Sequence, residues 1–240
     1  MSKTRLEAFT DGVIAIIITI MVLEVRTPHG TTWAALRQDL PVLLAYVLSF
    51  VLIGIYWNNH HHMLAAVTRI SGITLWANQH LLFWLSLIPV ATAWMSENHF
   101  PPIPVAAYGV VLLAASLAYS VLQATLLRTE GDDSLLAVAI GTDVKGRASN
   151  LIYGLGIGLS FANRWAGIAA CVAGALMWLI PDRRANARLA DRTKIAAASR
   201  LNRRCLPGLP GNAPWYQQLW LPIAWSRRTR RRRATTSLHR

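Results

Sequence analysis

The chain has 240 residues, of which 54% are hydrophobic and only 15% are charged, and its mean hydropathy is +0.35. Soluble domains carry about 45–50% apolar and about 25% charged residues, so this composition excludes an ordinary soluble enzyme. The net charge of +13 belongs to one end, because residues 1–182 hold 9 Lys/Arg against 10 Asp/Glu (−1) and residues 183–240 hold 15 against 1 (+14). With only Cys171 and Cys205, a disulfide framework is not expected.

Six apolar runs are long enough to cross about 30 Å of hydrocarbon. They lie near 9–25, 40–60, 73–95, 103–127, 148–163 and 165–181. The first lacks a small-residue cleavage site, so we expect it to stay in the mature protein. The last two are short, which requires nearly upright helices or a locally thinned bilayer. The sequence therefore predicts an all-α polytopic membrane protein with six transmembrane helices in residues 1–184, followed by a basic tail at 185–240.

The connections on the side of the N-terminus contain six Lys/Arg and those on the other side contain three. The basic tail adds to the first side, so we expect both termini in the cytoplasm. Trp57, Trp94, Trp165 and Trp178 fall near predicted span ends, where amphipathic indole rings are expected.

Polar residues stand at the head of the first apolar run, namely Arg5, Glu7, Thr10 and Asp11. Such residues are expensive in lipid, so they must face water, protein or each other. Taken alone, the segment is typical of a capped helix start, with Thr10 or Asp11 accepting backbone N–H groups and Gly12 allowing close packing.

The order of these residues is more informative than their composition. The run Arg5-x-x-x-Phe9-Thr10-Asp11-Gly12, continued by Ala15-Ile16-x-x-Thr19-x-x-x-Leu23-Glu24-Val25, resembles the opening helix of bacterial members of the transmembrane-protein-175 family of potassium channels. Further similar stretches are Ile53-Gly54-x-Tyr56-Trp57-x-Asn59-His60-His61, Leu75-Trp76-x-Asn78 with Pro89, and Pro181-Asp182-Arg183-Arg184. Thr10 departs from the family pattern, which usually has Ser there, but it keeps the hydroxyl group.

The resemblance implies a passive, potassium-permeable channel of the bacterial cell membrane, assembled as a homotetramer whose first helices surround the pore. The pore-lining stripe that it implies consists of Ile16, Thr19, Ile20 and Leu23. Composition alone would place this stripe against lipid or in the core. In the pore, the apolar side chains would form collars that gate by dewetting, and Thr19 would offer hydroxyls to transient potassium ions.

No Thr-Val-Gly-Tyr-Gly filter loop occurs in the chain. The nearest run, Gly154-Leu-Gly156-Ile-Gly158, favours close helix packing in the fifth span.

The resemblance also implies a structural polar network that ties the first helix to the second and third. Its expected members are Arg5, Phe9, Thr10, Asp11, His60, His61 and Asn78. Because a buried polar group without its partner is costly, such a network has to be satisfied as a unit.

Consecutive His60, His61 and His62 cannot chelate one ion together, because neighbouring side chains on a helix point about 100° apart. A polar cluster that senses pH is favoured over a metal site, and we expect no cofactor beyond the permeant potassium ion. The chain has no nucleophile with plausible His and acidic partners, no His-Glu-x-x-His and no phosphate loop, so we expect no enzyme.

The tail at 185–240 is predicted to be a mostly disordered basic extension. Adhesion to anionic lipid headgroups is its functional interpretation, while Arg runs are poor evidence for specific nucleic-acid binding. Two other functions stay open for the spans. A proton- or solute-coupled transporter would want an ionisable residue at mid-membrane, and a nontransporting scaffold requires only packing.

Overall fold

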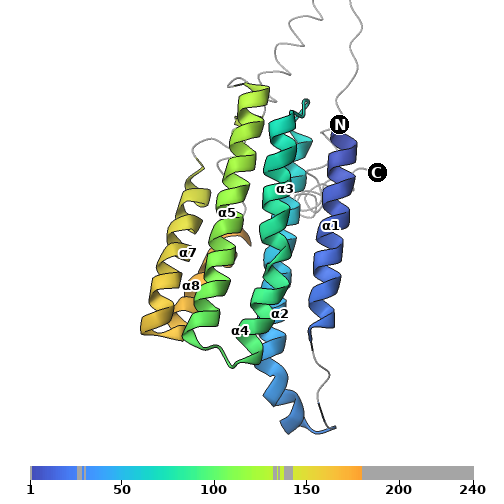
Figure 1. The fold of residues 1–240 in the computed structure, drawn as a ribbon. Coiled ribbons are helices and arrows are strands. Elements are labelled where there is room, and N and C mark those ends of the chain that lie inside the picture. Colours follow the sequence, from blue (N-terminus) through green and yellow to red (C-terminus); the bar gives the residue numbers. More distant parts are fainter. Residues whose placement is uncertain are drawn as a thin grey trace, which may run out of the picture. The chain divides into compact units, whose positions relative to one another are not determined.

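The computed structural model describes residues 2–25, 29, 31–131, 134, 136–137 and 143–179. Its elements are all helices within this part of the chain, and Figure 1 shows them running side by side. In chain order they are α1 (Lys3–Leu23), α2 (Trp33–Ala65), α3 (Gly72–Ser86), α4 (Ile88–Glu97), α5 (Pro102–Glu130), α7 (Val144–Ala162) and α8 (Arg164–Leu179). The tail at 185–240 and the end of the sixth predicted span lie outside the described residues.

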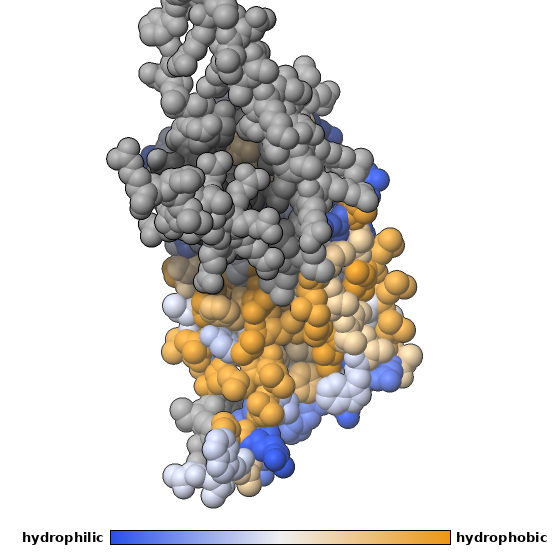
Figure 2. Space-filling model, turned by 180° about the vertical axis from the view of Figure 1, so that it is seen from behind, coloured by the Kyte–Doolittle hydropathy of each residue, from blue (hydrophilic) through white to orange (hydrophobic). Residues whose placement is uncertain are grey.

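The predicted all-α fold is confirmed, with helices at all six predicted segments. Four segments are long and apolar enough to cross a membrane, namely 3–23, 36–65, 72–97 and 102–130. Figure 2 shows the corresponding surface, in which apolar side chains cover the middle of one face and hydrophilic ones lie at its lower end. The two remaining helices, α7 and α8, have 19 and 16 residues and are the short pair that the sequence indicates.

The second and third segments differ from the simple spans that hydropathy predicts. With 33 residues at about 1.5 Å per residue, α2 is about 50 Å long. It is therefore longer than a helix needs to be to cross the hydrocarbon core. The third segment is two helices, since Pro89 has no N–H and its ring clashes with the carbonyl four residues earlier. Thus α3 ends at Ser86, and Leu87 donates its N–H to the Trp84 carbonyl at 3.2 Å before α4 begins.

The core lies around α5, which contacts α3, α4, α7 and α8. Hydroxyl groups buried there satisfy one another: Ser49 Oγ lies 2.7 Å from Thr92 Oγ1 and 2.9 Å from the Tyr108 hydroxyl. These three side chains join α2, α4 and α5. Each hydroxyl of the cluster therefore has a hydrogen-bond partner inside the apolar core. At one edge of the bundle, α1 packs on α2 and α3.

The hairpin of α7 and α8 turns at Asn163, whose N–H bonds to the Leu159 carbonyl at 2.7 Å. Of the glycine run in α7, Gly156 faces α8 closely enough that an added Cβ would lie 2.9 Å from Ala170 Cβ. Gly154 and Gly158 have nothing within 4 Å of such a Cβ. Close packing therefore rests on one of the three glycines.

Replacing Gly156 by Ala should destabilise the hairpin, because overpacking a helix contact costs about 1–3 kcal/mol. Gly158→Ala is the matched control and should be neutral or stabilising by up to about 1 kcal/mol, since it adds only helix propensity. Thermal unfolding of the purified chain in detergent measures both. Equal melting temperatures for the two variants would contradict this packing role.

Candidate ion pathway and its polar support

The four residues expected to line a pore lie together on the uncovered face of α1. Ile16, Ile20 and Leu23 are 59%, 43% and 82% exposed, and Thr19 between them is exposed as well. The stripe that packs on the rest of the bundle consists of Leu6, Thr10, Ile14, Ile17 and Met21. At 100° per residue the two stripes point about 120° apart, so no rotation of α1 buries both.

Thr19 is oriented to present an acceptor rather than a donor. Its hydroxyl donates to the Ile16 carbonyl of the preceding turn at 2.8 Å. The hydroxyl proton is thereby committed to the helix, and the remaining lone pairs of Oγ1 are available on the exposed face. An oxygen in this state can contact a cation.

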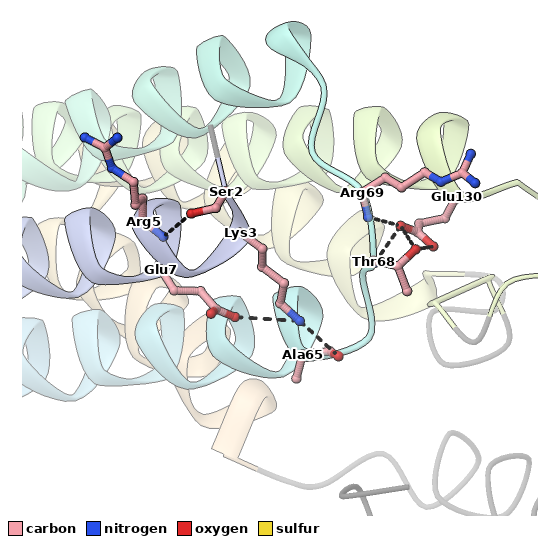
Figure 3. A network of polar contacts seen from close by, with 8 residues as sticks. All are labelled: Ser2, Lys3, Arg5, Glu7, Ala65, Thr68, Arg69 and Glu130. Atoms are coloured by element: carbon pink, nitrogen blue, oxygen red, sulfur yellow. Dashed lines mark hydrogen bonds and ion pairs between the residues drawn. The ribbon is translucent and has the colours of Figure 1, made fainter. Parts of the chain in front are cut away.

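Phe9 and Arg5 share this uncovered face, because they precede Ile16 at helical spacing. Phe9 is 45% exposed and borders a groove of about 500 Å³ with Leu6, Leu75 and Trp76. The Arg5 side chain points away from the other polar groups in Figure 3, and within the described residues its guanidinium has no hydrogen bond or ion pair. The structure therefore does not join Arg5 and Phe9 to the other expected network members.

Three expected network residues do meet, inside the bundle. His60 Nε2 lies 2.8 Å from Asn78 Oδ1, and Asn78 Nδ2 donates to Thr10 Oγ1 at 2.9 Å. Because an amide oxygen only accepts, Nε2 of His60 carries the proton of the first bond. Thr10 and Asn78 are fully buried and His60 is 2% exposed. This chain of bonds ties α1 to α3 and α3 to α2.

Asp11 and His61 lie in a second branch, in which Asp11 is exposed and His61 is half-buried. Trp57 Nε1 donates to Asp11 Oδ1 at 2.9 Å, and the His61 ring stacks on the Trp57 ring with centroids 6.1 Å apart. Trp57 is the connecting residue. The sequence places this indole near a span end and in a stretch similar to the family, but it does not indicate the bond to Asp11.

A further contact fixes the beginning of α1 at the end of α2. Figure 3 shows Lys3 between the two helices, with Nζ donating to the Ala65 carbonyl at 3.4 Å and lying 3.9 Å from Glu7 Oε1. Sequence spacing indicates the Lys3 and Glu7 pair, which are four residues apart on one helix. Nothing in the sequence points to Ala65.

The loop between α2 and α3 is held by Glu130 at the end of α5. Its Oε1 accepts the backbone N–H groups of Thr68 and Arg69, both at 2.7 Å, and the Thr68 hydroxyl at 3.1 Å (Figure 3). A carboxylate that accepts several N–H groups fixes the loop strongly, because charge-assisted bonds are the stronger kind. No local sequence pattern indicates this contact, because Glu130 lies 62 residues from Thr68.

The donor set of this region suits structural hydrogen bonding. In the part of the chain that the structure describes, no three His, Cys, Asp or Glu side chains are grouped so that they could hold a metal ion. His60 belongs to the buried chain, whereas the His61 ring stacks on Trp57 and lies 5.7 Å from the His62 ring.

Comparisons with known proteins identify what the chain resembles. The family model described as "Endosomal/lysosomal potassium channel TMEM175" matches residues 5–89. A protein named a potassium channel from Chryseobacterium sp. (strain P1-3) is 51% identical over 184 residues, which cover 77% of this chain and 96% of that protein. Another potassium channel, from Streptomyces collinus, is 34% identical over 69% of this chain and 86% of its own length.

A solved structure has the same arrangement of helices. The crystal structure of a lysosomal potassium-selective channel TMEM175 homolog from Chamaesiphon minutus aligns with a TM-score of 0.64 and 28% identity. The alignment covers 74% of this chain and 96% of that one.

Replacing Thr10 by Val should destabilise the protein by about 1–3 kcal/mol, because it leaves the buried Asn78 amide without its acceptor. Thr10→Ser keeps the hydroxyl and should cost less. Thr19→Val is the matched control, since it makes the same change on the exposed face of α1. Thermal unfolding in detergent measures all three, and a Thr10→Val protein as stable as Thr19→Val would show that the buried chain contributes nothing.

Proposed function

The chain belongs to the TMEM175 family of potassium channels, and we propose that its ion pathway is a central pore surrounded by the α1 helices of a homotetramer. This family consists of ion channels rather than enzymes. Potassium is the permeant ion, conduction is passive, and each subunit contributes Ile16, Thr19, Ile20 and Leu23 to the wall. The tetramer agrees with the oligomeric assembly expected for the family.

The observation that carries this proposal is the uncovered face of α1. A helix at the edge of a bundle could expose an apolar stripe to lipid, but this stripe contains Thr19 and continues to Arg5 at its beginning. Placing a polar group at membrane depth costs much free energy when the group faces hydrocarbon, and little when it faces a hydrated pore. Facing an axis shared with other copies therefore suits both kinds of side chain on this face.

The proposed pore combines two physical elements. Collars of Ile16, Ile20 and Leu23 exclude water when narrow, so a small rotation or tilt of α1 would open and close them by wetting. Rings of Thr19 oxygen replace part of an ion's hydration shell. Potassium gives up its water more readily than sodium, so a few hydroxyls favour potassium modestly.

The buried chain of Thr10, Asn78 and His60 is the proposed support of the pore wall. By fixing the rotation of α1, it keeps the stripe directed to the axis. In the assembly we further propose that Arg5 and Phe9 of this face contact a neighbouring subunit or the pore mouth, which would complete the polar network. We place the protein in the bacterial cell membrane with both termini cytoplasmic, and its basic tail at anionic lipid headgroups.

Reconstitution into liposomes with a potassium gradient tests the function directly. We expect potassium flux above that of empty liposomes, and a smaller flux under an equal sodium gradient. Insertion and orientation are verified separately by protease protection. Equal fluxes with and without correctly inserted protein would contradict the channel and leave a scaffold.

Two substitutions test whether α1 lines the pore. Leu23→Ala removes one collar from every subunit and should raise flux, because a wider apolar ring has a lower dewetting barrier. Thr19→Val keeps the side-chain shape but removes the hydroxyl, so the preference for potassium over sodium should fall.

The control for these variants is Leu151→Ala, which removes an equally large and 69% exposed side chain from α7. It should leave flux and selectivity unchanged. Unaltered transport in assembled Leu23→Ala and Thr19→Val proteins would show that this stripe does not line a pore.

A further inference from the structure

The uncovered face of α3 carries polar side chains inside a segment that can cross the membrane. This face consists of exposed residues at helical spacing, namely Ile73, Trp76, Gln79, His80 and Phe83. Gln79 and His80 lie about 10–12 Å from the beginning of the segment at 72–97. Placing polar groups at this depth against hydrocarbon costs free energy, so this face suits a protein partner better than lipid.

The hydrogen bond of His80 determines which ring nitrogen a partner can reach. Trp84 Nε1 donates to His80 Nε2 at 3.0 Å, so Nε2 is an acceptor and the proton of the neutral ring is on Nδ1. The exposed Gln79 amide next to it can both donate and accept. The face therefore presents groups that an amide side chain of a partner can satisfy.

A groove separates this face from α1. It has a volume of about 500 Å³ and is lined by Leu6, Phe9, Gly72, Leu75, Trp76, Asn78 and Gln79. Its wall is mainly apolar, with the exposed rings of Phe9 and Trp76 on its two sides and Gln79 as a polar edge. Such a groove fits a helix that combines aromatic and amide side chains.

The uncovered face of α2 has this combination. Val47, Phe50 and Trp57 are 46%, 42% and 43% exposed, and the Asn58 amide beside Trp57 is exposed as well. Asn58 lies within the segment at 36–65, which can also cross the membrane. Its amide would therefore be as costly against lipid as the amide of Gln79.

The polar groups of the two faces lie at the same depth. The bond between His60 and Asn78 sets residue 60 of α2 level with residue 78 of α3. The two helices are consecutive and run in opposite directions, so Asn58 is level with His80.

Within one subunit the two faces lie on different flanks of α1. Its contact with α2 is at Asp11, and its groove with α3 is at Phe9, two positions that point about 160° apart around the helix. The flanks also differ in charge, because the exposed Arg5 lies near the groove and the exposed Asp11 lies beside α2. One flank is thus complementary to the other flank of a second copy.

We propose that the groove between α1 and α3 binds α2 of a second copy of this chain, with Asn58 of that copy bonded to Gln79 and His80. This inference rests on the proposed tetramer and names the contact between its subunits. Rotation about an axis parallel to the helices keeps each residue at its depth, so Asn58 of one copy arrives level with His80 of the next. A contact of this head-to-tail kind, repeated about a fourfold axis, closes a ring.

Cross-linking in liposomes tests the contact. Asn58→Cys and Gln79→Cys are combined in the full-length chain after Cys171→Ala and Cys205→Ser, and a short bismaleimide is added. We expect covalent dimers, trimers and tetramers from the double variant, and monomers from either single variant. Dimers from Gln79→Cys alone would mean that two α3 faces meet, which would overturn the head-to-tail contact.

Leu23→Cys in the same background separates this contact from the proposed function, because Leu23 belongs to the proposed pore wall. If Leu23→Cys subunits are cross-linked but Asn58→Cys/Gln79→Cys subunits are not, the tetramer stands and this contact is overturned. Monomers in both cases, together with no potassium flux, would overturn both proposals.

Substitutions by leucine distinguish a second copy from lipid. Asn58→Leu and Gln79→Leu should each weaken association about threefold or more, as measured by energy transfer between labelled subunits on dilution with lipid. The double variant should associate about as weakly as Asn58→Leu alone, because both changes remove the same contact.

Gln38→Leu is the matched control, since it makes the same kind of change at an exposed position near the other end of α2. It should associate like the unmodified chain. Unchanged or tighter association of Asn58→Leu and Gln79→Leu would mean that both faces meet lipid, which favours leucine, and would overturn the contact.

Discussion

The placement of α1 depends on two hydrogen bonds, from Asn78 to Thr10 and between Asn78 and His60. Apolar packing alone specifies the rotation of a helix weakly, because the hydrophobic effect is not directional. A buried hydroxyl with one partner is different, since turning α1 away would leave the Asn78 amide unsatisfied. The polar chain thereby decides which side chains remain on the uncovered face.

The contacts at the ends of the helices extend this constraint. Lys3 ties the beginning of α1 to the last turn of α2, and Glu130 ties the following loop to α5. The Trp57 indole adds a bond to Asp11 on the exposed side. Together these contacts hold one end of α1 at several points. Toward Leu23, the buried stripe of α1 consists of the apolar Ile17 and Met21 among the described residues, so movement of α1 should be greatest around the proposed collars.

One physical rule accounts for both the polar chain and the hydroxyl cluster around Ser49. Polar groups inside an apolar bundle have to be satisfied. Around Ser49 and around Asn78, side chains satisfy one another directly. Because each of these bonds joins side chains of different helices, it fixes those helices relative to one another.

The sequence by itself determined the helical membrane fold, the six segments and the stripe of Ile16, Thr19, Ile20 and Leu23, because hydropathy and helical periodicity are local properties. It also indicated which family the first helix resembles. That resemblance implied a polar network of seven residues, of which Thr10, Asn78 and His60 are hydrogen-bonded to one another in the structure. Tertiary structure decided what local pattern cannot contain. It split the third segment at Pro89 and joined Trp57 to Asp11. It also placed Arg5 and Phe9 outside the buried chain. Each of these depends on side chains from distant parts of the sequence meeting in space, and their pairing is set by how the helices pack.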